Sequence, residues 1–220
     1  MTPTQIETGA RQLMNAVGSK FWSQDEIIGT YLYMSALEMA TETHCLENRY
    51  TTTSVADQRE YAVPSRMASI KRVTFDGVPL KIITFRQLDQ MDLNQSVAVT
   101  GTPQYYYYFD DAFGLYPTPE TAGLDIDIQS YDQPDVPTAT STLEIPSAFH
   151  GYLVIGTTYY MSLKELGHPN VSRFEFMWNG SNNRNNCIKK AQRSMRMRNK
   201  DQLHHVVREE HQPSNFIGMV

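Results

Sequence analysis

Cysteines and long apolar runs are both scarce in this chain of 220 residues. With only two cysteines, Cys45 and Cys187, it is not a small fold held by disulfides, and 12 glycines and 11 prolines are too few for collagen. Its apolar runs fall far short of the ~20 residues that span a bilayer. The N-terminal segment MTPTQIETGA lacks the basic and apolar regions of a secretory signal, so we expect a soluble chain of cytoplasmic origin.

Familiar catalytic motifs are absent as well. The sequence contains no glycine-rich nucleotide loop, no HExxH zinc motif and no GxSxG nucleophile motif. His204, His205 and His211 cluster near the C-terminus, but a polar tail does not by itself bring zinc ligands to one point. We therefore predict no catalytic residue, no metal and no cofactor. A hydrolase of cell-wall material that uses a carboxylate pair is an alternative without a supporting motif.

The composition is that of a folded protein rich in contact-forming side chains. Hydrophobic residues make up 40% of the chain and charged residues 20%, and a soluble chain of this length buries roughly 70% of its unfolded surface. Its 13 tyrosines and 11 methionines are residue types that cover large areas at interfaces. We expect one large or two small domains rather than a disordered chain.

Charge is distributed very unevenly along the sequence. Residues 87–163 contain ten acidic residues and no lysine or arginine, whereas residues 184–208 contain eight basic residues and one acid. An acidic surface repels nucleic acid, while a basic stretch suits an acidic partner or a phosphate backbone. The plainer interpretation is a solvated helix face beside an acidic β-domain. The candidate basic contact helix carries Lys189, Lys190, Arg193, Arg196 and Arg198.

Helical patterns occupy both ends of the chain. Apolar residues recur at helical spacing over residues 4–17, with Thr4 as the cap and Gly18 as the stop. A second helix is expected over about 24–46, because Ser23 is followed three residues later by a glutamate, as in a capping box. Its apolar positions cover more than one stripe, so this helix should be buried on two sides.

Further helix signals precede the second helix and follow the middle of the chain. Phe21 or Trp22 would pack on the first turn of the second helix as a hydrophobic staple. A third helix should start at Ser147, and a last long helix near Ser172. The asparagine-rich residues 179–186 are poor helix formers, so a break in the last helix is possible there.

The segment between residues 51 and 146 holds eight of the 11 prolines and shows β-type patterns. Asp76-Gly77 is a hairpin turn signal between two apolar runs. Residues 104–109, QYYYYF, indicate a strand whose tyrosines alternate between two faces, so that two belong to the core. Residues 124–128 alternate isoleucine or leucine with aspartate, which is typical of a half-buried strand with an acidic outer face.

The order of these patterns predicts an α+β fold. We expect a four-helix bundle from residues 1–50 and 147–199, an inserted antiparallel β-sheet or small sandwich from 51–146, and an extended C-terminal tail over 200–220. The tail shows no helical stripe and ends in apolar residues. Because such residues are costly to leave in water, we expect the tail to dock on a partner, with a frayed end as the alternative.

A series of short landmarks then points to a known family. Their order and spacing resemble the head-to-tail connector adaptors of tailed bacteriophages, which are also described as head-completion or tail-tubular gatekeeper proteins. The landmarks are Trp22-Ser23, Tyr61-Ala62-Val63-Pro64, Gly101-Thr102-Pro103-Gln104-Tyr105-Tyr106, Leu115-Tyr116-Pro117-Thr118-Pro119 and Ile145-Pro146-Ser147-Ala148-Phe149-His150.

The resemblance implies a non-enzymatic subunit of a ring, typically of twelve copies, in the neck of the virion. Double-stranded DNA would pass through the ring during ejection without specific binding, and no membrane is implied as a partner. In such adaptors the helical bundle and the C-terminal extension contact the portal protein, and the β-domain faces the tail or nozzle protein. Carried onto this chain, the portal-docking residues would be Phe216, Ile217, Met219 and Val220, and the tail-facing loop residues Asp110, Asp111 and Phe113.

The principal alternative is a nucleic-acid-binding module that uses the basic C-terminal helix. The sequence shows no helix-turn-helix or other docking frame, so such a module would contact the phosphate backbone without reading the bases.

Overall fold

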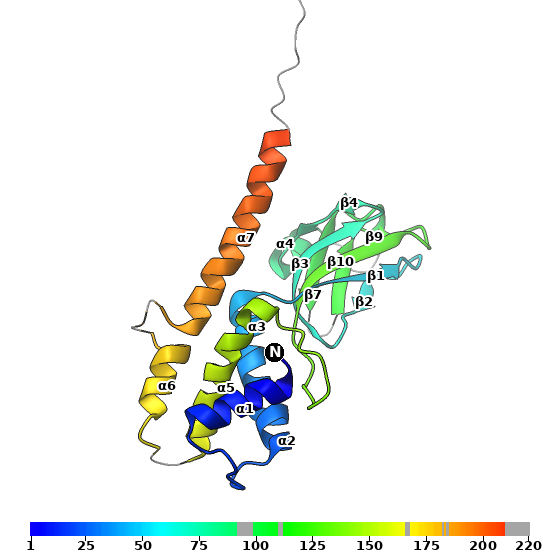
Figure 1. Cartoon of the computed structure of the whole chain (residues 1–220). Helices are drawn as coiled ribbons and strands as arrows, with labels where there is room; N and C mark the ends of the chain where they lie inside the picture. The colour runs from blue at the N-terminus through cyan, green and yellow to red at the C-terminus, as the bar shows by residue number, and fades with distance from the viewer. Residues whose placement is uncertain (92–98, 110–111, 166–167, 182, 184, 210–220) are drawn as a thin grey trace, which may run out of the picture. The chain divides into compact units, whose positions relative to one another are not determined.

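The computed structural model describes the chain except for residues 92–98, 110–111, 166–167, 182, 184 and 210–220, and it leaves out the side chains of 199–209. Backbone contacts divide the chain into two compact units, one of Met1–Cys45 with Val136–Val220 and one of Leu46–Asp135 (Figure 1). The first is helical and the second is built on β-sheets, so the fold is α+β. These bounds differ from the expected 50/51 and 146/147, because the second helix ends early and residues 136–146 associate with the helices.

The helical unit contains one helix near the N-terminus, a long run with a π-helical middle, and three further helices after the β unit. The predicted break in the last helix is confirmed, since two helices replace it. The elements are α1 (Pro3–Leu13), α2 (Gln24–Glu26), η1 (Ile27–Leu32), α3 (Tyr33–Thr43), η2 (Ser147–Phe149), α5 (His150–Lys164), α6 (Val171–Trp178) and α7 (Cys187–Glu209).

Helix α1 begins and ends earlier than the sequence pattern indicates. Thr2, not Thr4, is its cap: the Thr2 hydroxyl accepts from the Gln5 amide, and the Gln5 side chain accepts from the Thr2 amide. The helix stops at Leu13, and Asn15 adopts a left-handed conformation with φ of 54°. Val17, expected on the buried stripe, therefore lies in the connection to α2 and is 73% exposed.

The start of α2 follows the capping prediction. The Ser23 hydroxyl accepts from the Glu26 amide at 3.1 Å. Of the two staple candidates, Trp22 is buried in one cluster with Ile27, whereas Phe21 is 54% exposed. Trp22 therefore supplies the staple and Phe21 remains available at the surface.

Helix α5 is the centre of the helical unit. It packs against α1, η1, α3 and α6, while α7 lies against α3. The helices are thus grouped around one central member, and the expected four-helix bundle is not confirmed. Glu38 on α3 links this helix to α5 and α6, because its carboxylate accepts from Tyr160 on α5, from the Trp178 indole on α6 and from Asn179.

The expected C-terminal tail is partly helical. Helix α7 continues to Glu209, so the first ten residues of the segment 200–220 belong to a helix rather than to an extended chain. An apolar stripe is therefore not needed for this stretch to be helical: half of its ten residues, such as Lys200, Gln202 and Leu203, have good helix propensity.

The β unit is a sandwich of two four-stranded sheets with a small third sheet and one short helix, α4 (Phe85–Met91). The sheet orders are β1-β10-β3-β4 and β2-β8-β7-β5, and β6 pairs with β9. The strands are β1 (Glu47–Thr53), β2 (Glu60–Ala62), β3 (Met67–Phe75), β4 (Val78–Pro79), β5 (Lys81–Ile82), β6 (Thr100–Gly101), β7 (Tyr105–Phe109), β8 (Ala112–Tyr116), β9 (Thr118–Pro119) and β10 (Asp125–Asp132).

Pairing in the β unit is mostly antiparallel, as expected, but β5 pairs with β7 and β6 with β9 in parallel. The predicted hairpin joins β3 to β4, with Asp76 and Gly77 both at positive φ. The β10 alternation is confirmed, with Ile126 and Ile128 buried between the sheets. Helix α4 was not expected, because its single buried side chain, Leu88, gives no helical stripe.

The close approach of α5 to its neighbours generates a stability prediction. A Cβ at Gly156 would lie 2.8 Å from Ser35 and from the Trp178 ring, whereas a Cβ at Gly151, on the same helix, meets nothing within 4 Å. We expect Gly156→Ala to lower the free energy of unfolding by about 1–3 kcal/mol through overpacking. Gly151→Ala should leave it unchanged or raise it by up to about 1 kcal/mol. Urea unfolding measures both, and equal effects would contradict this view of the core.

Candidate interaction surfaces

Part of the expected contact set lies outside the described residues. This applies to the tail residues Phe216, Ile217, Met219 and Val220 and to the turn residues Asp110 and Asp111. Phe113 is described, and it corrects the expectation of a tail-facing loop residue. It lies on β8, is fully buried, and stacks on Tyr61 at 5.6 Å between ring centroids. Phe113 follows a turn in the sequence, which suggested exposure, but its side chain points into the sandwich.

The exposed aromatic residues of this hairpin are on β7. Tyr106 and Tyr107 are both buried, on opposite faces, because the sandwich core covers one face and the cluster with α4 covers the other. Phe109, at the end of β7, is 59% exposed, and its ring meets Phe85 of α4 at 5.4 Å. Phe85 is itself 43% exposed and also contacts Tyr107. We call Phe85 and Phe109 the aromatic patch.

The support beneath the aromatic patch is rigid. The Arg59 guanidinium lies over the rings of Tyr107 and Tyr116, at 5.5 and 5.6 Å from their centroids. Tyr107 also donates to Glu60 at 3.2 Å. Its ring occupies the space beside Gly114, where a Cβ would approach within 2.0 Å. Because Tyr107 is fixed in this way, the two phenylalanines rest on a defined base rather than on a loop.

The outer face of β10 is less acidic than the sequence indicates. Arg49 on β1 pairs with Asp127 through two contacts of 3.1 and 2.6 Å, and Thr51 donates to the same carboxylate. Lys71 on β3 pairs with Glu47 at 3.0 Å. The neighbouring strands thus supply cations that β10 alone lacks, and this face carries mixed charge.

The candidate basic residues lie on α7 but do not share one face. Ile188, Ala191 and Met195 are the buried side of the helix. Lys189 donates to the carbonyl of Ser181 at 2.9 Å, so its ammonium is held within its own segment. The remaining members, Lys190, Arg193, Arg196 and Arg198, are exposed, and Arg193 makes hydrogen bonds to Lys189 O and Asn185.

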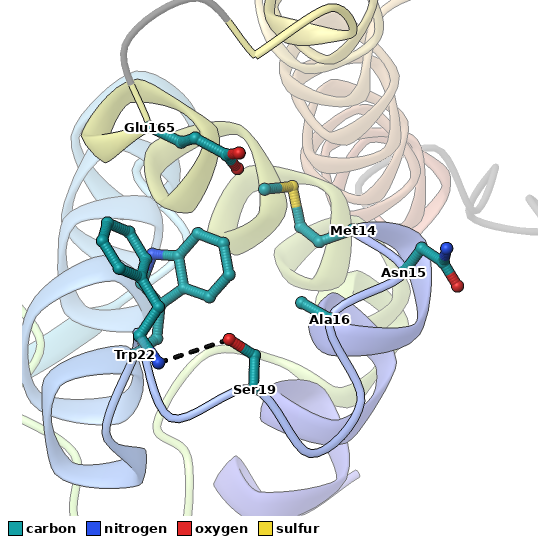
Figure 2. Close-up of a pocket in the computed structure, with 7 residues that line it drawn as sticks. Met14, Asn15, Ala16, Ser19, Trp22 and Glu165 are labelled. Carbon is teal, nitrogen blue, oxygen red and sulfur yellow. Dashed lines mark hydrogen bonds between the residues drawn. The ribbon is translucent and has the colours of Figure 1, made fainter.

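A surface that the sequence did not single out lies on the connection between α1 and α2. Leu13, Val17 and Phe21 are exposed there by 49%, 73% and 54%. Beside them is a pocket of about 310 Å³, lined by Met14, Asn15, Ala16, Ser19, Phe21, Trp22 and Glu165. Figure 2 shows its wall of Met14, Ala16 and Trp22, with Glu165 at the end of α5.

The base of this connection is held by a charged clamp. Lys164 pairs with Glu26 at 2.6 Å, donates to the Phe21 carbonyl at 3.3 Å, and lies over the Phe21 ring. The hydrogen bond from Lys164, followed by one from the Tyr31 hydroxyl at 2.7 Å, lowers the pKa of Glu26 below its usual range. Burial, followed by a hydrogen bond to Glu26, raises the pKa of Tyr31 to about 12.

Metal ligands are not gathered at one point in the described part of the chain. Its histidines, cysteines and acids form no group of three that could hold a metal ion. Both cysteines are buried, and burial raises the pKa of the Cys187 thiol to about 11. Among the described helices, none is both long and apolar enough to cross a membrane.

Exposed apolar side chains on otherwise closed units are typical of proteins that assemble with others. A structural assembly protein is therefore the class that these surfaces indicate. Residues 1–202 match the family model described as SU10 adaptor protein, and the chain belongs to that family. The resemblance noted in the sequence is thereby confirmed: the chain is a phage structural adaptor, a virion component that interacts with other phage head or tail proteins. No curated protein sequence matches the chain.

The clamp generates a titration prediction. Because the folded pKa of Tyr31 lies above its ordinary value of about 10, its contribution to stability is lost as pH rises from about 10 to about 12. Glu26→Gln removes the negative acceptor, so the Tyr31 pKa should fall but stay above its ordinary value because burial remains. Phenolate absorbance measures this, with Tyr31→Phe identifying the signal. A Tyr31 titration that Glu26→Gln leaves unchanged would contradict the clamp.

Proposed function

We propose that this adaptor forms a ring between the portal protein and the tail, and that DNA leaves the head through its channel. The observation that supports this best is the presence of a separate contact surface on each unit. The β unit carries the aromatic patch, and the helical unit carries the exposed connection and α7. A protein that joins two partners needs at least two such surfaces. Family membership supplies the head-to-tail context.

The portal contact is assigned to the C-terminal end. Helix α7 runs for 23 residues, and the apolar residues Phe216, Ile217, Met219 and Val220 follow it in the sequence. A polar segment with a few apolar anchors wraps a partner and accepts an ordering cost when it binds. The copy number of twelve and the neck position are taken from the resemblance.

The tail or nozzle contact is assigned to the β unit. The aromatic patch replaces Phe113 as the anchor, and Asp110 and Asp111 remain candidates beside it in the sequence. Aromatic residues are enriched at interface centres because they bury a large area at low cost in side-chain entropy. A rigid base such as Tyr107 and Arg59 adds to this, since little order has to be gained on binding.

A truncation tests the portal contact. Deleting residues 210–220 should reduce binding to isolated portal rings by at least tenfold and leave the thermal unfolding of the chain unchanged, because the described core ends before them. A full-length variant with Phe216, Ile217, Met219 and Val220 changed to Ser is the matched control for chain length and should behave like the deletion. Undiminished portal binding by both variants would refute the tail contact.

A paired substitution tests the tail contact. Changing both Phe85 and Phe109 to Ser should weaken binding to the tail or nozzle protein by tenfold or more, as expected for loss of central aromatic anchors. Val78→Ser, at a residue of the same unit that is 62% exposed, is the matched control and should leave binding unchanged. Binding is measured by sedimentation of purified components. Equal effects of the two changes would assign the contact elsewhere.

Sequence-independent nucleic-acid binding is the second candidate function. The exposed cations of α7, including Lys190 and Arg196, favour it. It requires an affinity for DNA that falls steeply with salt and that is lost when these two residues are changed to Glu. Absence of measurable binding at low salt would exclude it.

A further inference from the structure

The connection between α1 and α2 has the features of a socket. Three exposed apolar residues, Leu13, Val17 and Phe21, lie along it, and Phe21 lines a pocket that neither the portal contact nor the tail contact uses. At about 310 Å³ the pocket has room for one apolar side chain. One wall is the Trp22 ring, whose buried indole nitrogen has no hydrogen-bond partner among the described residues.

The lining of the socket contains one charged residue, and it is an acid. Glu165, at the end of α5, contributes its carboxylate to the lining (Figure 2). It forms no ion pair within the described residues. The nearby Glu26 is already paired with Lys164. The side chain that fills the socket should therefore be apolar and should have a cation close by.

Helix α7 presents such a combination. Met197 is 66% exposed, although it belongs to a helix whose other exposed residues are mainly basic. Lys190 lies two turns before it on the same face, and Arg196 is its immediate neighbour in sequence. Methionine is flexible, fills irregular apolar space and packs well against aromatic rings.

We propose that Met197 of one copy inserts into the socket of a second copy, beside Trp22, while Lys190 or Arg196 approaches Glu165. This inference rests on the proposed function, since it names the surfaces through which the ring closes. Socket and methionine lie on different surfaces of the helical unit, so the contact is head-to-tail. In a head-to-tail contact, each copy uses its socket with one neighbour and its Met197 with the other. The copies form a closed ring when the rotation that relates neighbours closes on itself.

Three features favour a second copy over a different protein as the occupant. The two halves are complementary in charge, one carrying Glu165 and the other Lys190 and Arg196, none of which forms an ion pair within the described residues. They are complementary in shape, one being a hollow and the other a projecting side chain. Both are present on every copy, so their stoichiometry matches without a further component.

Disulfide trapping in the purified full-length chain tests the proposal. A double variant with Val17→Cys and Met197→Cys should form a ladder of cross-linked oligomers under mild oxidation. A mixture of the two single variants should form only dimers. The native thiols are buried, so the unmodified chain should remain uncross-linked.

The matched control replaces Met197→Cys by Phe176→Cys, at a residue of α6 that is 52% exposed. This pair should give at most a tenth of the cross-linked product. Equal trapping of the two pairs, or no trapping of the Val17–Met197 pair at high concentration, would overturn the inference.

Charge-reversal variants distinguish the copy-to-copy contact from the portal contact. Glu165→Lys and Lys190→Glu should each reduce trapping several-fold, and mixing the two variants should restore it. Portal binding by these variants should be unchanged, because the tail residues are intact. Undiminished portal binding by the tail variants, with trapping preserved, would refute the portal contact alone. Trapping that does not respond to the charge reversals would refute the copy-to-copy contact alone.

Discussion

The helical unit depends on the fit of one indole between three helices. Trp178 is fully buried, it reaches Gly156 on α5, where no larger residue fits, and its N–H is satisfied by Glu38 on α3. A buried ring of this size needs both space and a hydrogen-bond acceptor, and residues distant in sequence supply them. Because this contact closes the interior of the unit, the apolar side chains that remain at its surface are available for partners.

Local signals in the sequence predicted much of the fold. Ser23, the Asp76-Gly77 turn and the alternation in β10 act through hydrogen bonds and spacing within a few residues, and all three are present in the structure. Other local signals were wrong: Thr4 and Gly18 were expected as the cap and the stop of α1, but Thr2 caps this helix and it ends at Leu13. The extension of α7 to Glu209 was not predicted, because apolar periodicity does not report a helical segment that lacks an apolar stripe.

The candidate surfaces were harder to predict than the fold. Phe113 and Phe109 flank the same turn, and only the register between β7 and β8 determines that the first is buried and the second exposed. Likewise, Val17 fits the helical spacing of residues 4–17, but the helix ends at Leu13 and leaves Val17 exposed. The sequence of β10 alone indicates an acidic face, but Arg49 on β1 and Lys71 on β3 pair with carboxylates on this face. The basic character of α7, by contrast, was visible from composition alone.

The two strands through which the chain enters and leaves the β unit are hydrogen-bonded to each other. Glu47, at the start of β1, stands opposite Tyr131, close to the end of β10, and the Asp132 amide donates to the Leu46 carbonyl. The inserted segment therefore has its two ends side by side, the arrangement in which whole domains are most easily transplanted. An insertion with this arrangement can be replaced as a whole domain without a change in the chain path of the helical unit that carries it.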